Sequence, residues 1–183
     1  IGQGHLTTFP PVVAQRLGIP VNAVRLVQGD SDEVPGGLPT VASRSMMMAG
    51  GSTVTACDQS IEKGRKIASH LFEAAAVDVE FAGGQFRVSG TDRAIPILEL
   101  AARTRAMPGQ PGDLAGGLDT VATFQSPQMS FPNGCHVAEV EIDPDTGAVE
   151  VVAYRSVNDF GTIVNPLLVD GQIQGGVAQG IGN

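Results

Sequence analysis

The chain has 183 residues, of which 42% are hydrophobic and 16% charged, a composition typical of a soluble globular protein with one domain or two small lobes. Its net charge of −8 argues against nucleic acid and against an anionic membrane surface as partners, because both attract basic proteins. No apolar run in the sequence has the length of a transmembrane helix.

The first predicted element is a short helix that is closed by Gly18. Its consecutive prolines, Pro10 and Pro11, fit only into a first helical turn, so Thr8 is the expected N-cap. Alternating apolar residues then predict a strand over residues 22–28.

The clearest helical signal covers residues 45–76, where small and apolar side chains recur at alternating intervals of three and four. The predicted stripe consists of Met47, Gly50, Val54, Cys57, Ile61, Gly64, Ala68, Leu71 and Ala75. Its two glycines predict a neighbour that packs closely, at a cost of about 1 kcal/mol each relative to Ala. The methionine run, residues 46–48, is interpreted as core filling.

Residues 77–81 and 85–89 predict a small β-hairpin, and residues 95–103 predict a short helix. Three further strands are expected at residues 121–125, 135–143 and 148–158. Pro144 and Gly147 favour a tight turn between the last two strands. A Gly-rich helix is expected to begin around Gly171.

These elements predict an α+β fold, with mixed or antiparallel sheets packed against one long and several short helices. The Gly- and Pro-rich residues 106–118 are the expected connector between two small lobes, residues 1–105 and 119–183.

The cysteines and histidines indicate no metal site in this chain. Cys57 and Cys135 lie far apart without metal-type spacing, so we expect buried, reduced thiols, and any iron–sulfur cluster would belong to another polypeptide. His5, His70 and His136 are isolated in the sequence, which makes metal ligation by this chain an unfavoured interpretation.

Three motifs combine small residues with amide or hydroxyl side chains near the start of a helix. The first is Gly2-Gln3-Gly4, the second covers residues 39–45 (Pro-Thr-Val-Ala-Ser-Arg-Ser), and the third begins at Gly171. Because the free N–H groups of a helix start favour an anion, these motifs can hold a polar, phosphate-bearing ligand with few cations.

Each motif also has a purely structural interpretation. Gln3 can cap a loop, and Gln172 and Gln174 can lie at a solvated helix start. The hydroxyl side chains of residues 40–45 can cap the long helix that follows. These alternatives leave open a stand-alone α+β scaffold or interaction domain, or a generic phosphate-binding module.

The three motifs in this order, with the Asp143-Pro144-Asp145-Thr146-Gly147 hairpin before the third, resemble the molybdenum-cofactor-binding subunit of the xanthine dehydrogenase/aldehyde oxidase/carbon monoxide dehydrogenase (molybdenum hydroxylase) family. The resemblance covers the whole chain, which would be a fragment from the C-terminal half of that subunit. It implies that residues 1–183 are part of a molybdopterin-binding domain. The implied cofactor-binding residues are Gly2, Gln3, Thr40, Val41, Ala42, Ser43, Arg44, Ser45 and Gln172.

The resemblance also implies a function and partners. The cofactor would be molybdopterin in its cytosine dinucleotide form, with molybdenum held by the pterin and not by side chains. The complete enzyme would oxidise aldehydes, N-heterocycles or related small molecules with water as the oxygen source. Its catalytic glutamate would lie beyond Asn183, so no catalytic residue is assigned here and the isolated chain is expected to be inactive.

The implied partners are the remainder of the molybdopterin subunit, iron–sulfur and FAD subunits or domains, and a small-molecule substrate. The full enzyme is expected to form a dimer and to reside in the cytoplasm or, alternatively, the periplasm.

Overall fold

The computed structural model describes residues 2–34, 36–37, 39–105 and 116–182, and these confirm the predicted α+β class. The chain divides into two compact units. The larger unit is His5–Pro127, and the ribbon unit combines Ile1–Gly4 with Gln128–Asn183. The predicted lobes differ from these units in residues 1–4 and 119–127, and residues 106–115 of the predicted connector lie outside the described part.

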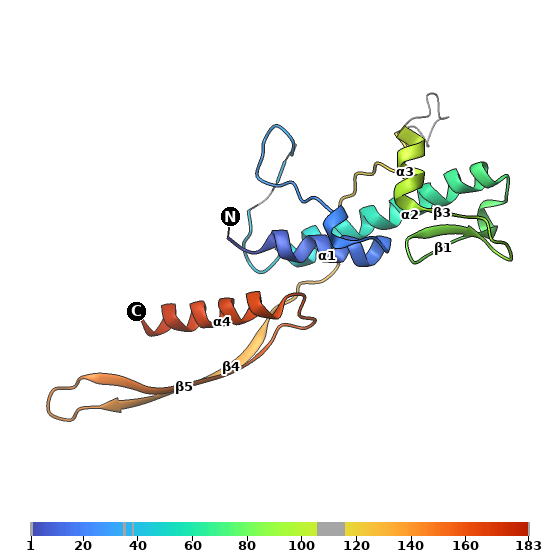
Figure 1. The fold of residues 1–183 in the computed structure, drawn as a ribbon. Helices are drawn as coiled ribbons and strands as arrows, with labels where there is room; N and C mark the ends of the chain where they lie inside the picture. Colours follow the sequence, from blue (N-terminus) through green and yellow to red (C-terminus); the bar gives the residue numbers. More distant parts are fainter. Residues whose placement is uncertain (1, 35, 38, 106–115, 183) are drawn as a thin grey trace. The chain divides into compact units, whose positions relative to one another are not determined.

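The larger unit packs helices against a three-stranded antiparallel sheet of order β1-β2-β3 (Figure 1). Its helices are α1 (His5–Leu17), α2 (Gly51–Phe72) and α3 (Ile97–Arg105). Its strands are β1 (Val79–Ala82), β2 (Gln85–Val88) and β3 (Ala94–Pro96). Short helical turns occupy Val21–Ala23, Met46–Gly50 and Ala76–Asp78.

The core of this unit lies where α2 and α3 meet the sheet, and its most buried large side chains are Phe86, Leu100 and Val79. The predicted stripe of α2 is confirmed there for Cys57, Ile61, Gly64 and Ala68, which are all buried. It does not extend to Leu71, which is exposed, or to Ala75, which lies beyond the end of α2. Gly64 allows the close packing expected of it, because a Cβ on this residue would lie 2.2 Å from Cζ of Phe86.

The predicted start of the first helix is wrong: α1 begins at His5, so Pro10 and Pro11 lie inside it and Thr8 is not an N-cap. The prolines remove two backbone donors. Burial of Phe9, Pro10 and Ala14 against the rest of the unit offsets that loss. The predicted end is confirmed, since Gly18 has a φ of +62° and Ile19 N–H donates to the Ala14 carbonyl at 3.0 Å.

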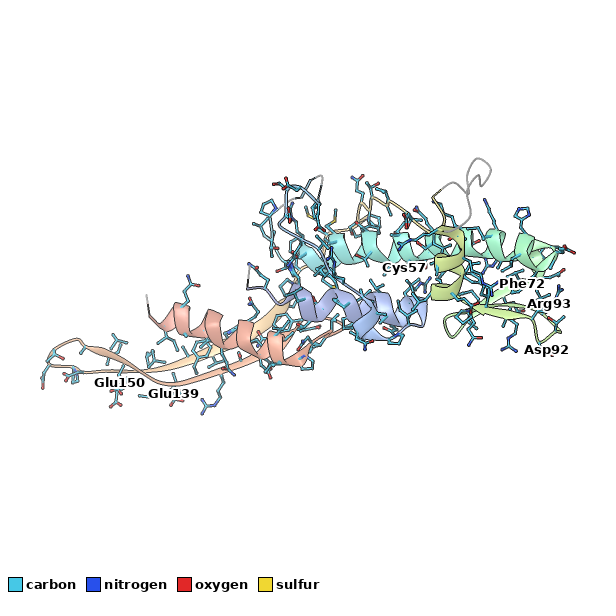
Figure 2. The ribbon with its side chains drawn as sticks, turned by 45° about the horizontal axis from the view of Figure 1, so that its top comes forward. Cys57, Phe72, Asp92, Arg93, Glu139 and Glu150 are labelled. Atoms are coloured by element: carbon cyan, nitrogen blue, oxygen red, sulfur yellow. The ribbon has the colours of Figure 1, made fainter. Side chains whose placement is uncertain are left out.

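α2 ends at Phe72, earlier than the predicted residue 76. Glu73 adopts a left-handed conformation with a φ of 49°, which stops the helix. Arg93 donates to the Phe72 carbonyl at 2.5 Å and lies over the Phe72 ring, so the end of α2 is held by the β2–β3 connection (Figure 2).

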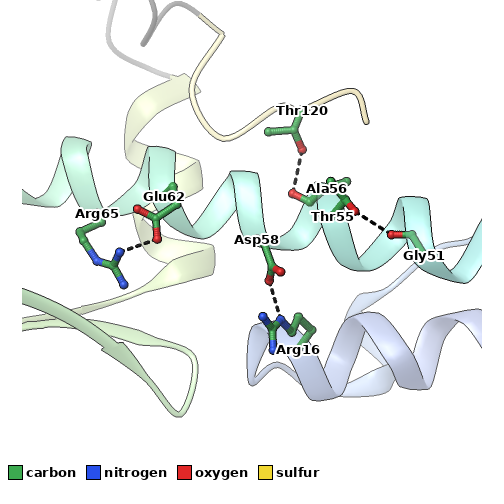
Figure 3. Close-up of polar contacts among 8 residues, drawn as sticks. All are labelled: Arg16, Gly51, Thr55, Ala56, Asp58, Glu62, Arg65 and Thr120. Atoms are coloured by element: carbon green, nitrogen blue, oxygen red, sulfur yellow. Dashed lines mark hydrogen bonds and ion pairs between the residues drawn. The ribbon is translucent and has the colours of Figure 1, made fainter. Parts of the chain in front are cut away.

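Two predicted strands are absent from the described residues. Residues 24–28 follow a 3₁₀ turn without pairing in a sheet, and residues 121–125 form no strand. Residues 118–120 are instead tied to α2. Thr120 donates to the Ala56 carbonyl at 3.1 Å (Figure 3), and Lys63 donates to the Asp119 carbonyl at 2.6 Å. An alternating sequence predicts a strand, but among the described residues no neighbouring strand forms backbone hydrogen bonds with these two segments.

A surface ion pair joins α1 to α2. Arg16 Nε lies 2.5 Å from Asp58 Oδ1 (Figure 3), and this contact raises the pKa of the already basic guanidinium. The neighbouring Cys57 is buried, and burial raises the pKa of its thiol. Cys135, by contrast, is exposed, so the expectation of two buried thiols is wrong for this residue.

The ribbon unit consists of the antiparallel strands β4 (Asn133–Ile142) and β5 (Val149–Asp159) and the helix α4 (Pro166–Ile181). The predicted strand pair and its turn are confirmed. Asp143 Oδ1 accepts hydrogen bonds from the N–H groups of Asp145 and Thr146 at 2.8 and 3.0 Å, which lowers the pKa of Asp143. Gly147 closes the turn with a φ of 72°.

Candidate cofactor-binding site

The nine predicted site residues fall into both units. Gly2, Gln3 and Gln172 lie in the ribbon unit, whereas residues 40–45 lie in the larger unit.

Residues 39–45 form a small loop that is closed by its own hydrogen bonds. Arg44 N–H donates to the Val41 carbonyl at 3.2 Å, and the Arg44 guanidinium donates to the Pro39 carbonyl at 3.0 Å. The Ser45 hydroxyl donates to Thr40 Oγ1, also at 3.0 Å. The loop thus holds its shape through contacts between neighbours in the sequence.

The turn inside this loop has an unfavourable backbone conformation. Ala42 and Ser43 have φ values of 52° and 54°, in the left-handed region that costs a non-glycine residue about 1–2 kcal/mol. Both residues are exposed, and Val41 beside them is 50% exposed. Strained turns of this kind cluster at ligand sites, where a fixed backbone shape is needed for binding.

The helix that follows the loop begins irregularly, because Met46–Gly50 is a π-helical turn ahead of α2. Such turns are rare and occur frequently at functional sites. Ser45, which precedes it, makes no side-chain capping hydrogen bond. The purely structural interpretation of Ser45 as an N-cap is therefore wrong, and its hydroxyl shapes the loop instead.

The first motif lies against the start of α4. Gly4 has a φ of 75°, and a Cβ on it would lie 2.3 Å from Cδ1 of Leu168, so a larger residue would be strained and would displace the Leu168 side chain. Gly2 and Gln3 are exposed beside this contact. The structure thus brings the first motif to the helix that carries the third.

Gln172 does not lie at a helix start, so that part of the prediction is wrong. α4 begins at Pro166, with the Asn165 side chain accepting from Leu168 N–H at 3.4 Å. Proline at the first position of a helix after an Asn N-cap is a strong start signal. Gln172 is therefore in the second turn, beyond the reach of the free N–H groups.

Gln172 instead lines a cleft of about 470 Å³ between α4 and the β4–β5 ribbon. His136 and Tyr154 line it from the strands, and His136 Nδ1 lies 3.0 Å from the hydroxyl oxygen of Tyr154. Sequence reasoning missed these two residues. Because side chains alternate between the two faces of a strand, the pairing of β4 with β5 puts both on one face of the ribbon. Gln174 does not line the cleft.

The glycines of α4 are small enough to let another backbone or a bulky ligand lie against the helix. Within the described residues, a Cβ at Gly171, Gly175, Gly176 or Gly180 would meet nothing within 4 Å. Gly176 and Gly180 line the cleft. No backbone or side chain of the described residues therefore packs closely against these four glycines.

The predicted residues suit a pterin that carries phosphate. Arg44 is the only cation among the nine, and the others offer backbone groups, hydroxyls and amides that can hydrogen-bond to phosphate oxygens and ring edges. Ala42 and Ser43 add a strained turn, a feature that clusters at ligand sites. The described residues contain no cluster of three or more His, Cys, Asp or Glu side chains that could hold a metal ion.

No helix in the described residues has the length and apolarity needed to cross a membrane.

Comparisons with known proteins connect this geometry to a family. The model of the molybdopterin cofactor-binding domain matches residues 1–183. The chain is 34% identical over 182 residues to the 6-hydroxypseudooxynicotine dehydrogenase complex subunit gamma of Paenarthrobacter nicotinovorans, covering 100% of this chain and 23% of that protein. It is 34% identical over 180 residues to the carbon monoxide dehydrogenase large chain of Hydrogenophaga pseudoflava, covering 98% of this chain and 22% of that one.

The fold agrees with these sequence matches. A crystal structure of the Cu,Mo-CO dehydrogenase superposes with a TM-score of 0.81 at 35% identity, over 96% of this chain and 22% of that one. The chain thus spans less than a quarter of the length of these relatives. The match over every residue and the shared fold confirm the resemblance of the three motifs: the chain belongs to the molybdopterin cofactor-binding domain family of the molybdenum hydroxylases.

Proposed function

We propose that this chain holds molybdopterin within a larger oxidoreductase subunit through the backbone and neutral side chains of its three motifs. The observation that carries the assignment of the site is the strained turn at Ala42 and Ser43, in a loop closed by its own hydrogen bonds. Such a turn gives the ligand a backbone that is already fixed, so that binding loses little further conformational entropy.

The proposed substrate is an aldehyde, an N-heterocycle or a related small molecule, with water as the oxygen source. Relatives named for carbon monoxide and for 6-hydroxypseudooxynicotine support a small substrate without selecting one. When bound, the cofactor would supply the two-electron redox chemistry and the site of oxygen transfer. The residues of this chain would bind and orient it, and we assign none of them a catalytic role.

The cytosine dinucleotide form of the cofactor is part of this proposal, supported by the likeness to the carbon monoxide dehydrogenase structure. Iron–sulfur and FAD groups would reside on partner subunits or domains, and the full enzyme would be a cytoplasmic or periplasmic dimer. The relative that is named as the gamma subunit of a dehydrogenase complex supports a multi-subunit assembly.

Ser43 offers a test of the strained turn in the complete subunit. We expect Ser43→Val to lower molybdenum and pterin content, because a β-branched residue is an outlier at positive φ. Ser43→Gly should retain both, since glycine adopts this conformation freely. The measurement is metal and pterin analysis of purified subunits with matched circular dichroism. Equal cofactor content in the two variants would contradict a binding role for the turn shape.

Gln172 and Gln174 form a second matched pair. They are chemically identical and lie about 200° apart around the helix, but only Gln172 faces the cleft. If its amide bonds the cofactor, Gln172→Ala leaves a ligand group unpaired at a cost of roughly 1–3 kcal/mol, or about 5- to 150-fold in affinity. We expect Gln174→Ala to keep its cofactor. Equal retention by both variants would show that this face of α4 does not bind the pterin.

A further inference from the structure

The pairing register of the β4–β5 ribbon shifts at a β-bulge. Glu139 pairs with Ala153, whereas the next residue, Val140, pairs with Val151, so Val152 is the extra residue of β5. Figure 1 shows the turn end of the ribbon reaching past the C-terminal end of α4. Among the described residues of this unit, no helix therefore covers the turn end of the ribbon (Figure 1).

One face of this distal half is apolar. It is formed by two cross-strand pairs, Val140 with Val151 and Ile142 with Val149. The four side chains are 48%, 40%, 60% and 64% exposed in that order, and only Val151 also lines the cleft beneath α4. We call these four residues the distal apolar face. A contiguous exposed patch of aliphatic side chains is typical of an interaction surface.

The opposite face of the distal ribbon is acidic. Glu141 and Glu150 lie directly across from each other, an arrangement of like charges that destabilises a strand pair. Glu139, labelled with Glu150 in Figure 2, lies nearer the bulge and is paired with Arg155 at 3.3 Å. A two-stranded ribbon is marginal in water even without such repulsion. The distal ribbon therefore needs burial of its other face to be held firmly.

We infer that the distal apolar face is covered by polypeptide of the same subunit from outside residues 1–183. This inference rests on the proposed function, in which the chain is part of a larger subunit. The relatives supply the reason for that occupant, because the chain spans only 23% and 22% of their lengths. Contact within one polypeptide also avoids the entropy lost when two molecules associate.

Other occupants are disfavoured. Four half-exposed aliphatic side chains are too few for a second copy, because a standard interface buries roughly 800 Å² on each partner. The acidic opposite face and the net charge of −8 oppose insertion into an anionic membrane surface.

Cysteine labelling of the complete subunit tests the coverage. Ile142→Cys and Glu141→Cys place thiols at neighbouring positions on opposite faces of β4, and both native side chains are exposed within this chain. We expect maleimide to label the Ile142 variant about tenfold more slowly than the Glu141 variant, because labelling a covered thiol requires local opening. Rates are taken per peptide by mass spectrometry and normalised to the denatured subunit. Equal normalised rates would overturn the inference.

Photo-crosslinking identifies the occupant. A diazirine amino acid at position 142 of the complete subunit should link to peptides of the same polypeptide outside residues 1–183, and position 141 serves as the control. Links to residues 5–127, or links that join two copies and disappear on dilution, would overturn the inference.

Molybdenum and pterin content of the same preparations separates the two proposals. Cofactor-loaded subunit with an uncovered position 142 refutes only the docking surface. A covered position 142 in a subunit that holds no cofactor under loading conditions refutes only the cofactor site.

Discussion

Replacing Phe86 by alanine is expected to destabilise the larger unit by about 3–5 kcal/mol, the usual cost of removing a large buried aromatic side chain. Phe86 is fully buried, lies over Gly64 of α2 and packs against Phe81 with ring centroids 4.8 Å apart. Its removal leaves a cavity between α2 and the sheet, and the glycine opposite has no side chain to fill it.

The measurement is urea unfolding followed by circular dichroism. Leu98→Ala is the matched control, because Leu98 belongs to α3 of the same unit but is 49% exposed. We expect this control to change the free energy of unfolding by no more than about 0.5 kcal/mol. If the two variants unfold at the same urea concentration, Phe86 does not have the central position in the core described here.

The second large effect is expected at Gly84, in the turn between β1 and β2. A Cβ on Gly84 would lie 2.3 Å from the carbonyl oxygen of Gly18, at the end of α1. Neither atom belongs to a flexible side chain, so the helix end and the hairpin would have to separate. Gly84→Ala is therefore expected to cost about 1–3 kcal/mol for overpacking, in addition to about 1–2 kcal/mol for its positive φ.

Gly83 supplies the control within the same turn. It also has a positive φ, 56°, but a Cβ there would meet no atom of the described residues within 4 Å. Gly83→Ala should therefore show only the conformational cost. Thermal unfolding of both variants isolates the steric contribution as their difference. A destabilisation of Gly83→Ala as large as that of Gly84→Ala would argue against close contact between α1 and the hairpin.

Strong periodicity made several elements predictable. The stripe through Cys57, Ile61, Gly64 and Ala68 predicted the buried face of α2, because helical spacing alone decides which side chains share a face. The β4–β5 pair was predictable for a similar reason, since alternation and a Gly-containing turn are local signals. The prediction that Gly18 ends α1 was also correct, because glycine adopts the left-handed conformation that ends a helix without help from distant residues.

Predictions that needed non-local information were wrong. Local rules placed the prolines in the first turn of α1 with Thr8 as its N-cap, whereas the helix, with Phe9 and Ala14 buried, begins at His5. The strands predicted at residues 22–28 and 121–125 have alternating sequences but no pairing partner among the described residues. Strand formation depends on a neighbouring strand, which a short stretch of sequence cannot supply.

In the candidate site, too, some features follow from local sequence and others from the tertiary structure. The sequence by itself determined which three motifs carry the family resemblance, because a motif is defined by the order and spacing of its amide, hydroxyl and glycine residues. Only the tertiary structure decided that Ala42 and Ser43 share a strained turn and that Gln172 faces the ribbon. It also decided that the bulge at Val152 puts Val149 and Val151 on the face of the ribbon that α4 leaves open at its far end. One inserted residue reverses the inward and outward alternation of a strand, and the sequence pattern does not show where the insertion falls.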